Sequence, residues 1–208
     1  MLKTLTWFAA ALLVAVVMVR TGVEAQSPAP DGPVFSRAGA LQRPLDYREW
    51  AFVTTGLGMT YGPTQPAAGQ PRYFDNVFVN RSSYKAFLQT GKWPDKTMFV
   101  LEIRESQQNV SIDNGGVTQG GKIMAIESAV KDVARFPNGG WGYFDFGGGE
   151  GMKTEVAVLP SDARCYACHR DNTAVENTFV QFYPTLFEVA KRLGTVKATY
   201  DPNHKVQQ

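Results

Sequence analysis

Two cysteines and a histidine lie within five residues near the C-terminal end of the chain, in the order Cys165-Tyr166-Ala167-Cys168-His169. Residues three apart on a helix share one face, so both thiols can form thioethers with the two vinyl groups of one haem. His169 follows directly and can place its imidazole under the iron, while its second ring nitrogen donates to a backbone carbonyl. The motif therefore predicts one covalently bound haem c, attached through Cys165 and Cys168, with His169 as the axial metal ligand.

Three other interpretations of the motif compete with haem attachment. A thioredoxin-like redox pair normally opens a helix early in a βαβ unit, whereas Cys165 and Cys168 lie late in the chain. A zinc site needs four ligands, and the only other histidine, His204, lies in a polar C-terminal tail. Chance clustering is disfavoured because both cysteines of the chain and one of its two histidines fall within five residues.

The ligand on the opposite side of the iron separates electron transfer from ligand binding. No methionine follows His169, and His204 is a remote candidate. Methionines that precede the motif are more often core residues than iron ligands; they include Met59, Met98, Met124 and Met152. The sequence therefore favours a five-coordinate iron beneath an apolar pocket lined by aromatic side chains.

Length and composition fit one exported domain of ordinary size. The 208 residues carry a net charge of +2, which gives no electrostatic reason to expect nucleic acid or an anionic membrane surface as a partner. Lys3, a following apolar run and a small-residue site before Gln26 predict a cleaved signal peptide over residues 1–25. The protein is therefore expected to be periplasmic or secreted. The alternative is an uncleaved anchor, which would be its only contact with a membrane.

The rest of the chain divides by composition. Residues 26–43 are rich in proline, alanine and glycine and are expected to form a flexible leader, residues 44–197 one domain, and residues 198–208 a polar tail. Strands are predicted over 72–79, 97–104, 122–130 and 141–146. Helices are predicted over 45–53, from about residue 80 to Gly91, and within 161–193, which carries the haem motif. These elements predict an α+β fold with a mainly antiparallel sheet and a few helices.

Several groups of residues follow one another along this domain in a specific order. They are Tyr47-Arg48-Glu49-Trp50, Val77-Phe78-Val79 with Ser83-Tyr84, Thr90-Gly91-Lys92-Trp93-Pro94-Asp95, Glu127-Ser128-Ala129-Val130-Lys131-Asp132, Arg135-Phe136 with Trp141, the haem motif, and Phe179-Val180-Gln181-Phe182-Tyr183-Pro184-Thr185-Leu186. Taken in this order, they resemble the cytochrome P-460 and cytochrome c′-beta family over about residues 47–193.

The resemblance implies a mainly antiparallel β domain, usually a homodimer, with a five-coordinate c-type haem and the motif histidine as its proximal ligand. In members that oxidise hydroxylamine, a lysine on the strand after the Trp-Pro-Asp turn is bonded to the haem edge. An ungapped comparison places Leu101 there, and leucine cannot form that bond. Phe99 shares the face of Leu101 by strand alternation, and Phe74 lies in the stretch that corresponds to a distal arginine in some members. Phe74, Phe99 and Leu101 are the expected distal pocket.

The expected function is the binding of nitric oxide or a similar small ligand. An apolar pocket suits diatomic gases, whereas a charged ligand would lose its solvation there. The alternatives are an enzyme that oxidises hydroxylamine or detoxifies reactive nitrogen species, and a simple electron-transfer cytochrome. Expected partners are a small-molecule ligand or redox partner and a second copy of the chain. No pair of carboxylates has a spacing that argues for acid–base chemistry, and Glu102 should point away from the face of Leu101.

Overall fold

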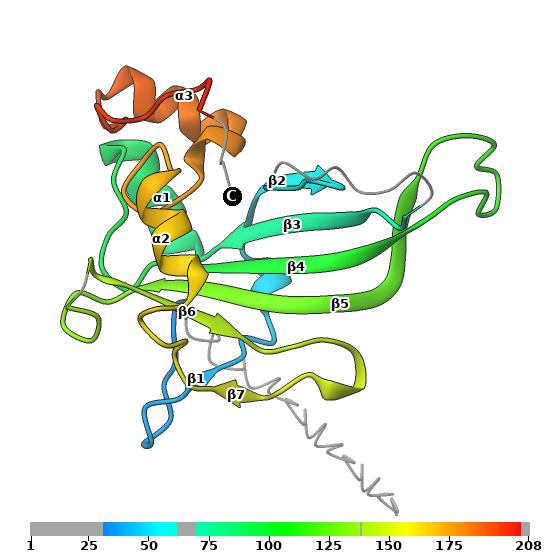
Figure 1. Cartoon of the computed structure of the whole chain (residues 1–208), viewed down its shortest axis with the longest axis horizontal. Coiled ribbons are helices and arrows are strands. Elements are labelled where there is room, and N and C mark those ends of the chain that lie inside the picture. The colour runs from blue at the N-terminus through cyan, green and yellow to red at the C-terminus, as the bar shows by residue number, and fades with distance from the viewer. Residues whose placement is uncertain (1–30, 62–69, 138, 205–208) are drawn as a thin grey trace, which may run out of the picture.

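The computed structural model of the protein describes residues 31–61, 70–137 and 139–204. Five antiparallel strands form the main sheet in the order β2-β3-β4-β5-β6, so each strand pairs with its neighbour in the chain. Their bounds are β2 Ala51–Leu57, β3 Tyr73–Val79, β4 Met98–Gln107, β5 Thr118–Lys131 and β6 Trp141–Asp145. Figure 1 shows the helices gathered at one end of this sheet and the hairpin between β4 and β5 at the other.

Strand alternation divides the sheet into two faces. Phe99 and Leu101 of β4 lie on one face, where Leu101 pairs with Val77 of β3. Val100 and Glu102 of the same strand lie on the opposite face. The prediction that Glu102 points away from Leu101 is therefore confirmed by the strand register.

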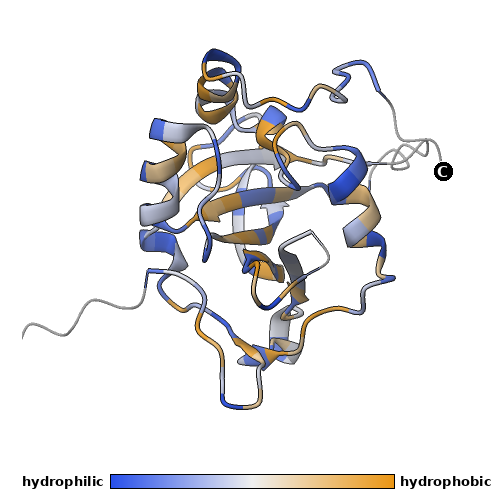
Figure 2. Ribbon diagram, turned by 90° about the vertical axis from the view of Figure 1, so that its left-hand side faces the viewer, coloured by the Kyte–Doolittle hydropathy of each residue, from blue (hydrophilic) through white to orange (hydrophobic). Residues whose placement is uncertain are grey.

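Three helices pack on the face that carries Phe99 and Leu101, which we call the helical face. They are α1 Arg81–Thr90, α2 Arg164–Asp171 and α3 Pro184–Arg192, with a 3-10 turn, η3 Val180–Phe182, before α3. Their apolar sides form one core with the sheet, which includes Phe87, Trp93, Phe99, Trp141, Tyr183 and Leu186. Figure 2 shows these helices as alternating hydrophobic and hydrophilic bands, as expected for helices with one buried side.

A second core covers the opposite face. It contains Leu41, Trp50, Met98, Phe144 and Phe146. The segments that close it are the 3-10 turns η1 Tyr47–Glu49 and η2 Gly149–Gly151 and a two-stranded sheet, in which β1 Leu41–Gln42 pairs with β7 Glu155–Val156. Two cores on the two sides of an antiparallel sheet, with few helices, confirm the predicted α+β fold.

Two predictions about the N-terminal part of the domain are wrong. The flexible leader over 26–43 does not extend to its predicted end, because Leu41 is fully buried and its strand pairs with β7. The helix predicted over 45–53 is only the short turn η1, and β2 begins at Ala51, because pairing of Ala51 with Val79 outweighs the local helical spacing. The signal peptide predicted over 1–25 lies outside the described residues.

The other elements agree more closely with the sequence. Each of the four predicted strands is present within a few residues of its expected bounds. The helix α1 ends as predicted, at Gly91, which adopts a left-handed conformation with φ 66°. Among the described residues, none of the helices has the length and apolar character needed to cross a membrane.

Candidate functional site

The helix α2 carries all three residues of the haem motif. Cys165 and Cys168 are one turn apart on it, both are partly exposed, and neither forms a disulfide. No residue of α2 is fully buried, but Cys165 and Tyr166 contact the core of the helical face and His169 is partly buried. The helix therefore presents two free thiols on one side, an arrangement that could receive a covalently attached group.

His169 is held in one orientation by its surroundings. Its Nδ1 lies 2.8 Å from the carbonyl oxygen of Asn177, and its ring packs between Tyr143, at a centroid distance of 4.5 Å, and Phe179, at 4.6 Å. Burial lowers the pKa of His169, so the imidazole is neutral at neutral pH. A neutral ring whose Nδ1–H donates to a carbonyl leaves Nε2 available for a metal.

Cys165 does not have the character of a reactive thiol in a redox-active pair. Burial raises the pKa of the Cys165 thiol, and the negative charge of Glu127 raises it further, whereas reactive thiols of thioredoxin-like motifs have lowered pKa values. A zinc site fails as well, since the described residues contain no cluster of three or more metal-binding side chains, and His204 is exposed in the C-terminal segment. Free thiols, a neutral histidine and aromatic neighbours fit a c-type haem.

The predicted pocket residues separate in the structure. Leu101 is partly exposed on the helical face. Phe99 is on the same face but only 5% exposed, packed against Trp93 at a centroid distance of 4.8 Å and near Tyr183 at 5.9 Å. Phe99 therefore belongs to the core beneath the surface, whereas Leu101 remains partly accessible.

Phe74 does not join them, so its assignment to the pocket is wrong. It pairs with Arg104 of β4, and Arg104 forms an ion pair with Glu102 on the opposite face. Alternation along β3 instead puts Asp75 and Val77 on the side of Leu101. The assignment failed because alternate residues of β3 face opposite sides of the sheet, and Phe74 precedes by one residue a position that faces the helices.

Carboxylates on the helical face are the feature that the sequence did not reveal. Glu127 of β5 pairs directly with Leu101, and Asp75 of β3 pairs with Ile103 on the same face. Partial desolvation raises the pKa of Glu127, which lies at the exposed surface of this face, and the charges of Asp145 and Asp75 raise it further. Burial also raises the pKa of Asp75 to about 6. The signal that would have found them is strand register, which no local pattern in the sequence provides.

One methionine also lies on this face. A side-chain carbon added at Gly56, which pairs with Asp75, would meet the sulfur of Met59. Met98 and Met152 belong instead to the core of the opposite face. Of these three methionines, Met59 is therefore the one on the side of α2.

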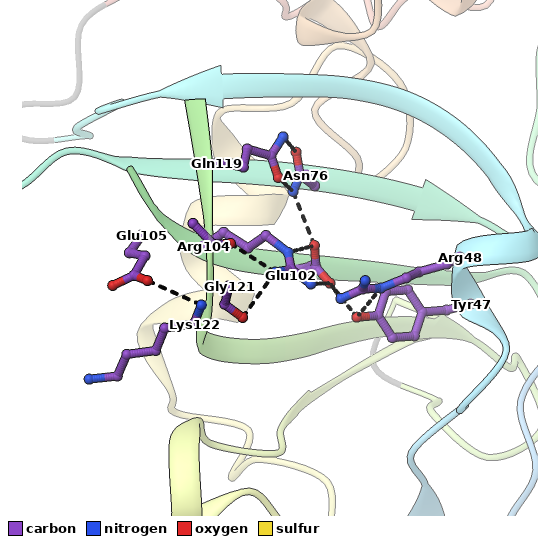
Figure 3. Close-up of polar contacts among 10 residues, drawn as sticks. Tyr47, Arg48, Asn76, Glu102, Arg104, Glu105, Gln119, Gly121 and Lys122 are labelled. Carbon is purple, nitrogen blue, oxygen red and sulfur yellow. Dashed lines mark hydrogen bonds and ion pairs between the residues drawn. The ribbon is translucent and has the colours of Figure 1, made fainter. Parts of the chain in front are cut away.

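The opposite face carries a separate polar cluster around Glu102. Its carboxylate accepts hydrogen bonds from Tyr47, Arg48, Asn76 and Arg104, and Figure 3 shows these side chains converging on it. Glu102, Arg48, Asn76 and Arg104 line a cavity of about 460 Å³ together with Phe52 and Phe78. Because the donors are directed at Glu102, this cluster is a structural element and not part of the site at α2.

Comparison with known proteins identifies the family of the chain. The family model for cytochrome P-460 matches residues 44–180, which includes the five strands of the sheet and the helix α2. No curated protein matches the chain. The match covers more than half of the sequence and contains Cys165, Cys168 and His169. The chain therefore belongs to the cytochrome P-460 family of haem cytochromes.

Proposed function

We propose that the protein binds one haem covalently through Cys165 and Cys168, ligates its iron through His169, and binds nitric oxide or a similar small ligand on the other side. The observation that carries this proposal is the apolar centre of the helical face. Val77 and Leu101 are directly opposite each other on adjacent strands, and both are partly exposed. Apolar surface of this kind accepts a diatomic molecule without a desolvation cost.

The residues of this chain have distinct roles in the proposal. The haem supplies the iron that takes the ligand. The backbone carbonyl of Asn177 accepts a hydrogen bond from His169 Nδ1–H and so orients the ring, which packs against Tyr143 and Phe179. Leu101 keeps the haem edge free of any protein bond of the kind a lysine would form. Covalent attachment at α2 keeps the haem on the protein whatever its oxidation state.

An absorption spectrum of the reduced haem-loaded protein, with and without nitric oxide, tests the function. The expected result is a high-spin spectrum that changes on addition of the gas, and a protein mass that shows one haem and two thioethers. A low-spin spectrum that does not respond to nitric oxide would overturn it. The variant Cys165→Ala/Cys168→Ala, from which acidified solvent should extract haem, is the matched control for covalent attachment.

The carboxylates favour a second candidate, an enzyme that oxidises hydroxylamine or a related reduced nitrogen compound. Such a reaction releases protons, and the carboxylate of Glu127, whose pKa is raised, lies next to Leu101 as a candidate proton acceptor. The test is turnover of hydroxylamine with an artificial electron acceptor. Turnover that Glu127→Gln reduces by about 100-fold, with unchanged nitric oxide binding, would favour the enzyme over the binding protein.

Met59 provides the test of the third candidate, an electron carrier. A thioether bound to the iron would give a stable low-spin spectrum, and Met59→Leu would convert it to high spin. A wild-type spectrum that is already high spin, and that Met59→Leu leaves unchanged, would exclude Met59 as a ligand and support the open site.

We also propose that the protein is exported and forms a homodimer. Mass spectrometry of the protein from its native host should find an N-terminus at Gln26, and light scattering should give twice the mass of the mature chain. An N-terminus at Met1 together with recovery in the membrane fraction would support the uncleaved anchor instead.

A further inference from the structure

A short loop between α2 and η3 carries the carbonyl group that orients His169. This carbonyl belongs to Asn177. The residues on either side of it, Glu176 and Thr178, are both fixed by their side chains to one tryptophan, Trp93. The backbone N–H of Trp93 donates to the Glu176 carboxylate at 3.3 Å, and its indole Nε1 donates to the Thr178 hydroxyl at 2.8 Å. The carbonyl that accepts the hydrogen bond of His169 is thus held at both neighbouring residues by contacts with Trp93, an arrangement that we call the brace.

A lysine on the sheet contacts both Glu176 and Trp93 and so joins the two sides of this brace. Lys131, at the end of β5, donates to the second carboxylate oxygen of Glu176 and to the carbonyl of Trp93, each at 2.7 Å. The Lys131 and Glu176 side chains are only 17% and 25% exposed. The pair therefore fixes the relative position of the loop after α2 and the segment before β4.

The brace holds a conformation that the loop would not favour alone. Glu176 has φ 48°, in the left-handed region, which costs about 1 kcal/mol or more for a residue other than glycine. A partly buried ion pair is also a weak source of stability, because desolvation offsets most of the attraction. Both features are better explained by a requirement for one fixed geometry at Asn177 than by stability of the fold.

We propose that Lys131 and Glu176 are positioning residues that set the strength of the His169–Asn177 hydrogen bond, and through it the electron donation of His169 to the iron. This inference rests on the proposed function. A strong hydrogen bond from Nδ1–H gives the imidazole more anionic character, which strengthens its bond to the metal and lowers the reduction potential. A mobile Asn177 carbonyl would weaken that bond and raise the potential.

Three variants and one control test the role of the brace in the haem-loaded protein. Glu176→Gln keeps an oxygen acceptor for Trp93 but removes the ion pair. Glu176→Gly removes every side-chain contact, and relief of the left-handed strain offsets part of the stability lost with the ion pair. Lys131→Arg keeps the cation. The control is Glu188→Gln, which breaks an exposed ion pair with Lys191 on α3.

The readouts are the iron–histidine stretching band of the reduced protein in resonance Raman spectra and the reduction potential. Both Glu176 variants should shift the band to lower frequency and the potential upward, while Lys131→Arg and Glu188→Gln stay near wild type. Variants of Glu176 that coincide with wild type in both readouts would overturn the inference and leave the proposed function intact. A wild-type protein without an iron–histidine band, because its iron is six-coordinate, would overturn both.

Discussion

Neutralising Glu102 should destabilise the protein strongly without touching the haem motif. The Glu102 side chain is 3% exposed, and it neutralises Arg104, which is 12% exposed. The substitution Glu102→Gln keeps the size of the side chain but removes its charge. It therefore leaves Arg104 as an uncompensated charge inside the opposite face and weakens the hydrogen bonds from Tyr47 and Asn76.

The expected loss of unfolding free energy follows from the burial of the Glu102–Arg104 ion pair. Removing one partner of a buried ion pair costs about 3–5 kcal/mol, whereas the whole free energy of unfolding of a domain is about 5–15 kcal/mol. The melting temperature of a domain of this size should fall by about 10 °C. Arg48, which also pairs with Glu102, should add little to the loss of stability, because its side chain is 52% exposed and can turn toward solvent.

Urea unfolding of the haem-loaded protein, followed by circular dichroism, measures the loss as a lower midpoint at an unchanged slope. Glu155→Gln, at an exposed position of β7, is the matched control and should stay within about 0.5 kcal/mol of wild type. The double variant Glu102→Met/Arg104→Met removes both charges and should recover much of the loss. A Glu102→Gln protein within about 1 kcal/mol of wild type would refute the reasoning.

Three further substitutions test other parts of the structure. Gly148→Ala should prevent normal folding, because its added carbon would lie 1.8 Å from the carbonyl oxygen of Met124. The control Gly151→Ala, whose added carbon has no neighbour within 4 Å, should express as wild type. Equal yields of soluble protein from the two variants would contradict this packing. Asp75→Asn should have a higher melting temperature than wild type at about pH 7.5 and the same melting temperature at about pH 4. A carboxyl whose pKa is raised to about 6 in the fold contributes stability at low pH and loses that contribution as the pH rises through 6. Melting temperatures that differ equally at both pH values would reject the raised pKa. Phe99→Ala should cost about 3–5 kcal/mol in urea unfolding, because the ring is enclosed by core aromatics, and a loss below about 1 kcal/mol would show that it lies at a surface instead.

The sequence predicted the elements whose pattern is local. The strand around Phe99 was recognisable from alternation and β-branched residues, and the end of α1 from Gly91. The prediction of haem attachment likewise used only five consecutive residues. Each of these predictions depends on neighbours in the chain, which is the information that a sequence displays directly.

The sequence failed where a residue's role depends on a distant partner. Ala51 follows a helix-like segment but pairs with Val79, and Phe74 is one residue out of phase with Leu101. Glu127 lies beside Leu101 only because β5 pairs with β4 in one particular register. A shift of one residue would move every side chain of a strand to the other face, so register decided the site and could not be read locally.

The order of the strands bears on how the protein matures. Each strand of the sheet pairs with the one made just before it, so the sheet can assemble early and from contacts close in sequence. The helix α2 follows all five strands, and none of its residues is buried. A maturation enzyme that attaches haem would therefore meet a sheet already formed, with both thiols still within reach. Under the proposed covalent attachment, the haem would therefore complete the domain and would not initiate its folding.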